Sequence, residues 1–142
     1  MNNDVGDQNH HGREVPTFGR GTCVYRGVLI GDPYGHDHDL SLYASYSEHS
    51  GFELTIHDDG HYPVDELHTA LWVKPDHVRD LLRALGGNIG DDPVELLVQQ
   101  IESGSIPVKE GGGLRWERVC IDRWFSENGV QYTSASKNVS NL

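Results

Sequence analysis

The sequence predicts an α+β fold, in which an antiparallel sheet of about four to five strands carries three helices packed on one face. Apolar residues alternate with period two in the first half of the chain and recur at helical spacing in the second half. A run of strands followed by a run of helices is typical of this fold class. The length of 142 residues suits one domain. We place that domain at residues 21–136, between a flexible N-terminal arm (1–20) and a polar tail (137–142).

Strands are expected at residues 22–30, 39–47, 51–58, 69–73 and 130–136. The segments "DLSLYASYS" and "GFELTIHD" are separated by a short connector and therefore predict a hairpin. Pairing Tyr46 with Phe52 and Leu42 with Ile56 sets apolar side chains opposite one another, whereas a shift of one residue would set Leu42 opposite His57. The second face of this hairpin is polar, so we expect a sheet that is covered on one side only.

Helices are expected at residues 75–87, 91–104 and 114–129. The first of them carries a buried stripe at positions i, i+3, i+4 and i+7, which consists of Val78, Leu81, Leu82 and Leu85. The second has a well-marked start. Asp92 occupies the N-cap position, Pro93 the first helical position and Glu95 the third, where a carboxylate can reach back to the cap.

The formal charge of −11 argues against direct binding of nucleic acid and against docking on an anionic membrane. The acids are concentrated in residues 1–68, where 12 Asp and Glu stand against only three Arg. The stretch "MNNDVGDQNHHGREVP" lacks the charged-then-apolar order that is typical of a signal peptide, and no apolar run reaches the roughly 18–20 residues that a membrane span needs. Two cysteines, Cys23 and Cys120, form no zinc or redox motif. We therefore expect a cytoplasmic protein.

The stretch "YGHDHDL" at 34–40 is the most unusual feature of the chain. If the hairpin register continues, one neighbourhood brings together Asp37, Asp39, His57, Asp59 and His61. Imidazole and carboxylate ligands suit Zn or Mn, so a metal site of His57, His61, Asp37 and Asp39 is one hypothesis. A general acid–base group is another, because His titrates near neutrality.

We also expect the polar face of the hairpin to bind another protein. Tyr43 lies on it among acids, and a tyrosine ring supplies contact area while carboxylates attract a basic partner. The contact residues that we expect are Asp37, Asp39, Tyr43, Glu53, Asp58 and Asp59. The sequence contains no nucleophile elbow and no phosphate-binding glycine loop, so we expect a protein without catalytic residues.

The block "LWVKPDHVRDLLRALGGNIGDDPVELLVQQIESG", followed by "RWFSENGVQYTSAS", resembles small actinobacterial proteins, some of which occur in toxin–immunity neighbourhoods. The resemblance covers residues 69–136 and carries no functional residue. With the acidic charge, it favours an immunity or antitoxin-type inhibitor that neutralises a basic toxin, such as a nuclease, by occluding its active site. A mobile-element inhibitor of a host nucleic-acid machine would need the same surface. The alternative function is a metal-binding protein or metal-dependent enzyme that uses the His/Asp cluster with Zn or Mn.

Overall fold

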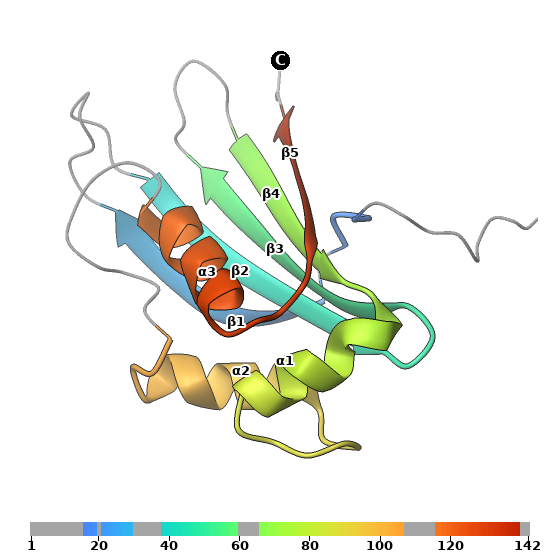
Figure 1. Cartoon of the computed structure of the whole chain (residues 1–142). Helices are drawn as coiled ribbons and strands as arrows, with labels where there is room; N and C mark the ends of the chain where they lie inside the picture. The colour runs from blue at the N-terminus through green and yellow to red at the C-terminus, as the bar shows by residue number, and fades with distance from the viewer. Residues whose placement is uncertain (1–15, 20, 30–37, 60–65, 107–115, 140–142) are drawn as a thin grey trace, which may run out of the picture.

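Five strands form one antiparallel sheet, in the order in which they occur along the chain (Figure 1). The computed structural model describes residues 16–19, 21–29, 38–59, 66–106 and 116–139. The strands are β1 (Thr22–Leu29), β2 (His38–Ser47), β3 (Gly51–Asp59), β4 (Glu66–Val73) and β5 (Thr133–Val139). With three α-helices beside this sheet, the predicted α+β class is confirmed. The last strand continues to Val139, so the expected tail boundary at residue 136 lies too early.

The register of the hairpin β2–β3 is the predicted one. Tyr46 pairs with Phe52 and Leu42 pairs with Ile56. The same ladder continues to Asp39, which pairs with Asp59 at the end of β3. Matching apolar side chains across the ladder fixes this register, because a slip of one residue would move every apolar side chain to the other face.

A short 3-10 helix, η1 (Pro75–His77), leads into α1 (Val78–Ala84), and α2 (Pro93–Glu102) and α3 (Trp116–Glu127) follow. The predicted cap of α2 is confirmed, because the Asp92 side chain accepts a hydrogen bond of 3.0 Å from the Val94 backbone N–H. No helix in the described ranges has the length and apolar character that crossing a membrane requires.

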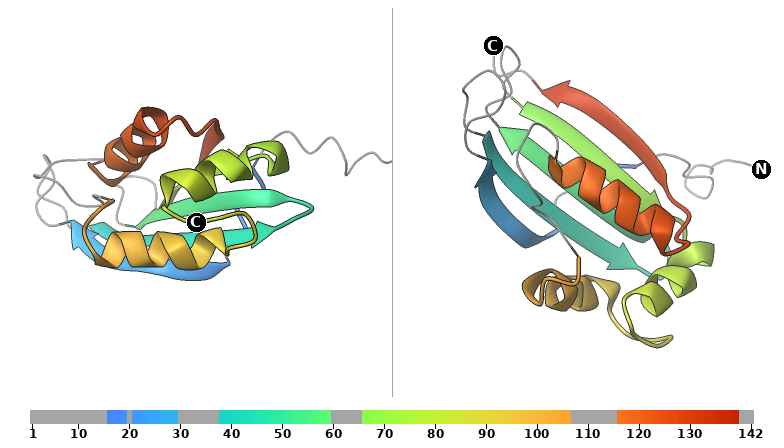
Figure 2. Two further views of the ribbon diagram at one scale, coloured as in Figure 1. Left: turned by 60° about the horizontal axis from the view of Figure 1, so that its bottom comes forward. Right: turned by 60° about the vertical axis from the view of Figure 1, so that its left-hand side comes forward.

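All three helices pack on the same face of the sheet (Figure 2). The core-facing strand residues alternate along the strands, and they include Leu40, Leu42, Ala44, Phe52, Leu54, Ile56, Leu71 and Val73. The whole predicted stripe of α1 joins this cluster, together with Leu97 of α2 and Phe125 of α3. The core is therefore a single layer between one face of the sheet and the helices.

The opposite face of the sheet, called the back face below, is not open to solvent at its centre. Thr55 is 0% exposed and Trp72 is 3% exposed, although both point away from the helices. The segment Pro16–Gly19 lies over this face, and the Thr55 hydroxyl donates a hydrogen bond to the carbonyl oxygen of Gly19 at 3.1 Å. The expectation of a sheet covered on one side only is thus wrong. Alternation shows that a face is polar, but it cannot show whether another segment covers that face.

Candidate functional site

Of the six expected contact residues, three are buried. Tyr43, Glu53 and Asp58 are all buried, the last two with exposures of 4% and 2%. Asp39 is exposed on β2, and Asp59 ends β3 opposite to it. Asp37 lies outside the described residues. A contact residue must be accessible to its partner, and the buried side chains of Tyr43, Glu53 and Asp58 are not accessible in this structure.

Glu53 is buried because it holds the segment Pro16–Gly19 on the back face. One carboxylate oxygen, Oε1, accepts hydrogen bonds from the Thr17 backbone N–H at 2.9 Å and from the Thr17 hydroxyl at 3.1 Å. The other oxygen, Oε2, accepts from the Gly19 backbone N–H at 3.0 Å. Between them, Phe18 packs under the Lys137 ammonium group, which lies 4.6 Å from the ring centroid. Residues 16–19 therefore belong to the folded domain and not to a flexible arm.

Asp58 is buried for a different reason. It continues the alternation of Leu54 and Ile56 on β3, which places it on the core face, with Leu40 and Leu67 as its neighbours across the ladders. The period-two pattern that set the register also set this orientation. Asp58 is therefore turned into the core and does not contribute to the back face.

The remaining back-face side chains form a row of aromatic and cationic groups. Arg26 donates a hydrogen bond of 3.2 Å to the Tyr43 hydroxyl, which raises the pKa of this guanidinium above its ordinary value. The Tyr43 ring is tilted against the His57 ring, with their centroids 4.9 Å apart. His57 in turn stacks on His68 at 3.9 Å, with an interplanar angle of 11°. The sequence did not single out His68, although the pairing of β3 with β4 brings the two imidazoles together.

The expected metal site has only two of its four residues, His57 and Asp39, in the described part of the chain, since Asp37 and His61 lie outside it. His57 is buried against the rings of Tyr43 and His68. Within the described ranges, no three His, Cys, Asp or Glu side chains gather as they would around a metal ion. The arrangement of His57 is explained by ring packing on the back face.

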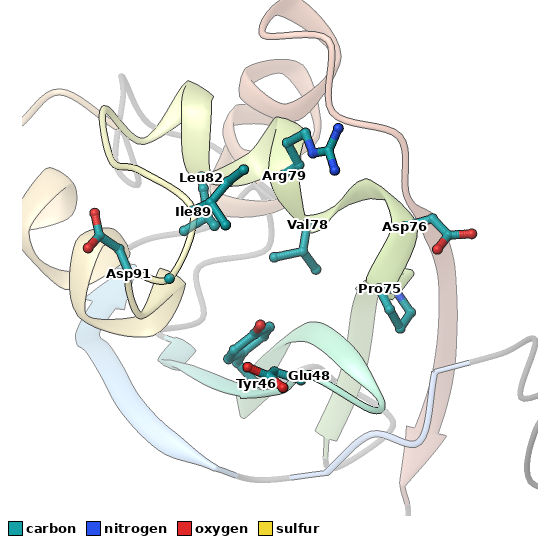
Figure 3. Close-up of a pocket in the computed structure, with 10 residues that line it drawn as sticks. Tyr46, Glu48, Pro75, Asp76, Val78, Arg79, Leu82, Ile89 and Asp91 are labelled. Carbon is teal, nitrogen blue, oxygen red and sulfur yellow. The ribbon is translucent and has the colours of Figure 1, made fainter.

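A groove of about 390 Å³ opens on the helix side of the sheet, where the β2–β3 turn meets α1 (Figure 3). Gly51, with φ +89°, lets the β2–β3 turn pack closely against the end of β4 and the start of η1, because a Cβ atom there would collide with the Val73 carbonyl oxygen and crowd Pro75. Tyr46 is the last core-facing residue of β2, and its ring points across the groove toward Val78 of α1. The groove thus lies where three chain segments converge, and no single segment forms it.

The third segment is the turn Asn88–Asp91 between α1 and α2. The Asp91 carboxylate accepts a hydrogen bond of 2.7 Å from the Asn88 backbone N–H, and the Asp91 N–H donates to the Asn88 carbonyl at 3.0 Å. At the tip of this turn Ile89 is 78% exposed, the one large apolar residue so exposed in the described part of the chain. Ile89 is therefore presented to solvent by an ordered turn.

The chemistry of the groove is divided between its floor and its rim. The floor is apolar and consists of Tyr46, Val78 and Leu82, with the exposed residues Pro75 and Ile89 at its edge. The rim carries the carboxylates of Glu48, Asp76 and Asp91 and a single cation, Arg79. Such a site suits an apolar side chain whose neighbours are positively charged. Ile89 was not singled out from the sequence, although it is an isolated apolar residue in the polar loop "GGNIGDD" and belongs to neither helical stripe.

A second, smaller hollow of about 280 Å³ lies beside the Glu53 clamp, on the other side of the β2–β3 turn. Its lining is mostly polar and includes Thr17, Ser45, Ser47 and Ser50. It lacks a large apolar surface, so it offers less to a protein partner than the groove does.

Comparison of the chain with protein-family models, with curated proteins and with solved structures finds no match.

Proposed function

We propose that this protein is an acidic protein-binding module of the immunity or antitoxin type, which neutralises a basic toxin such as a nuclease by occluding its active site. The observation that carries the proposal is a surface of one charge sign beside the groove. Between Arg83 and Lys109 the chain has four acids and no Lys or Arg. These acids, Asp91, Asp92, Glu95 and Glu102, are all exposed.

An acidic surface of this kind selects its partner by charge. It repels nucleic acid, because both carry negative charge. It attracts a basic protein and accelerates the encounter, most strongly at low ionic strength. A protein that acts on nucleic acid must itself present cations to phosphates, so its active site is a natural target for carboxylates held in a fixed array.

The proposal that the partner is a toxin rests in addition on the resemblance of residues 69–136 to proteins from toxin–immunity neighbourhoods. That segment includes η1, α1 and α2, and therefore most of the groove lining and the whole acidic surface. The first hairpin contributes Tyr46 and Glu48. The contact surface proposed here lies on the helix side of the sheet.

The test is salt-dependent capture of a basic partner. The full chain is immobilised and exposed to native-host extract at ~10 mM salt, where the Debye length is about 30 Å, and bound proteins are eluted toward ~1 M salt, where it is about 3 Å. We expect a basic protein, encoded beside this chain, whose toxic activity the purified chain abolishes. Retention of no basic protein, or retention without loss of toxic activity, contradicts the proposal.

A charge variant ties the result to the acidic surface. Neutralising Glu95 and Glu102 together (Glu95→Gln, Glu102→Gln) removes two exposed carboxylates from α2 without touching the Asp92 cap. The partner should then elute at lower salt. Glu127→Gln is the matched control, because this acid is equally exposed but lies at the end of α3. If Glu127→Gln has half the effect of the double variant, so that each carboxylate removed counts equally, the binding depends on net charge alone.

A further inference from the structure

We infer that the groove between the β2–β3 turn, α1 and the turn Asn88–Asp91 is the docking site for one large apolar side chain carried on a basic segment of the partner. This inference rests on the proposed function and specifies the part of the partner that is recognised. The juxtaposition of an apolar floor with a carboxylate rim carries it.

The floor explains the apolar part of the ligand. Val78 and Leu82 are one helical turn apart on α1. Both are buried in the core cluster, and both line the groove beside the half-buried ring of Tyr46. Ile89 stands at the edge with most of its surface in water. A side chain that enters between Tyr46 and Ile89 removes apolar surface from water on both sides, which is a favourable change.

The fixed conformation of the Asn88–Asp91 turn favours binding of the ligand. Two hydrogen bonds close this turn, and Gly90 adopts φ +100°, which only glycine adopts without strain. Ile89 is therefore held in place before the ligand arrives, and binding does not have to order the loop. The volume of about 390 Å³ lies in the range of ligand-binding pockets and is sufficient for a large aliphatic or aromatic side chain.

The rim explains the charge of the ligand. Glu48, Asp76 and Asp91 stand against Arg79 alone, and Glu48 and Asp76 are both exposed. Arg or Lys residues that flank the apolar side chain would meet these carboxylates, whereas an acidic segment would be repelled. A second copy of the chain is a poor occupant, because each copy brings a charge of −11.

The experiment uses three fluorescently labelled model peptides and the full chain. The first peptide has a single Leu flanked by Arg on both sides, the second has Ser in place of Leu, and the third has Glu in place of Arg. Binding is followed by fluorescence anisotropy. We expect the Leu peptide to bind about tenfold more tightly than the Ser peptide, and the Glu peptide not to bind.

Two protein variants assign the effect to the groove. Ile89→Ser should weaken the Leu peptide about fivefold to tenfold and leave the Ser peptide unchanged, because it removes apolar surface only. The double variant Glu48→Gln with Asp76→Asn should weaken both Arg-containing peptides and reduce the salt dependence of binding. Gln99→Ser on α2 and Glu127→Gln at the end of α3 are the matched controls, since both residues are exposed and lie outside the groove. Neither control should reproduce the effect of its counterpart.

Equal affinity for the Leu and Ser peptides, or an Ile89→Ser protein that binds the Leu peptide like the wild type, overturns the inference. So does concentration-dependent dimerisation that Ile89→Ser abolishes, because a second copy would then be the occupant. These outcomes differ from failure of the proposed function. If Ile89→Ser captures the native partner as well as the wild type does, the groove is not the docking site. The proposed function as an acidic protein-binding module is then unaffected.

Discussion

The substitution Glu53→Gln tests whether the buried carboxylate fastens Pro16–Gly19 to the back face. Glutamine has the same shape, but only one of its two terminal atoms accepts hydrogen bonds. In the native protein both carboxylate oxygens accept, Oε1 from the Thr17 N–H at 2.9 Å and Oε2 from the Gly19 N–H at 3.0 Å. Whichever way the amide is turned, its NH₂ group faces one of these backbone donors. At least one backbone N–H therefore loses its acceptor.

The magnitude follows from these contacts. A hydrogen bond to a charged group contributes roughly 1.5–3 kcal/mol, a neutral one roughly 0.5–1.5, and a buried donor without an acceptor costs about 1–3 kcal/mol. The lower cost of burying a neutral amide offsets part of this loss. We expect the free energy of unfolding to fall by about 2–3 kcal/mol, a large fraction of the ~5–15 kcal/mol that stabilises an ordinary domain.

Two assays separate loss of stability from release of the segment. Urea denaturation followed by tryptophan fluorescence gives the free energy of unfolding. Chymotryptic cleavage after Phe18 under native conditions reports how often Pro16–Gly19 leaves the back face, and it should become faster in Glu53→Gln. Glu48→Gln is the matched control, because the same chemical change is made on an exposed turn residue and should alter stability by less than about 0.5 kcal/mol. If both variants have the same stability and the same cleavage rate, the clamp does not hold the segment.

Three further substitutions test the fold around the groove, each by urea denaturation. Gly51→Ala should destabilise the protein by at least ~3 kcal/mol, because φ is +89° and the new Cβ collides with the Val73 carbonyl oxygen. Gly104→Ala is the control, since this glycine has φ +85° but lies in open space, and it should cost only about 1 kcal/mol. Equal effects of the two substitutions would contradict close packing at the β2–β3 turn. Phe125→Ala should cost about 3–5 kcal/mol, since this ring of α3 lies in the buried cluster, and a change below about 1 kcal/mol would show that the ring does not anchor α3 there. Asp92→Ala should cost about 1 kcal/mol through loss of the α2 cap, and an unchanged midpoint would contradict that role.

Local patterns in the sequence predicted much of the architecture. The alternation through β2 and β3 set the register of the central hairpin, because a side chain's face in a strand is decided by whether its position is odd or even. The start of α2 was also predicted from the sequence, because its cap involves a side chain and a backbone N–H that are only two residues apart. The stripe of Val78, Leu81 and Leu82 faces the core as expected.

The candidate site was predicted less well, and the error has a physical cause. The polar face of the hairpin was expected to meet solvent and a partner, but Thr17 and Gly19 supply hydrogen bonds to Glu53, a residue more than 30 positions away. Asp58 was expected in the same patch as Asp59, although the alternation itself places it among the core-facing positions. That second error was avoidable from the sequence. The first was not, because a covering segment leaves no periodic signal in the strand that it covers.

The sequence by itself determined the class of the fold, the order of its elements, the central register and the excess of negative charge, because each depends on residue composition or on neighbours within one helix or strand. Only the tertiary structure decided which surface is available. The groove joins Tyr46, Pro75 and Ile89 from three separate segments, and Gly51 lets the β2–β3 turn pack against the end of β4 and the start of η1. Long-range packing of this kind is not periodic along the chain, so it is found in the folded molecule and not in the sequence pattern.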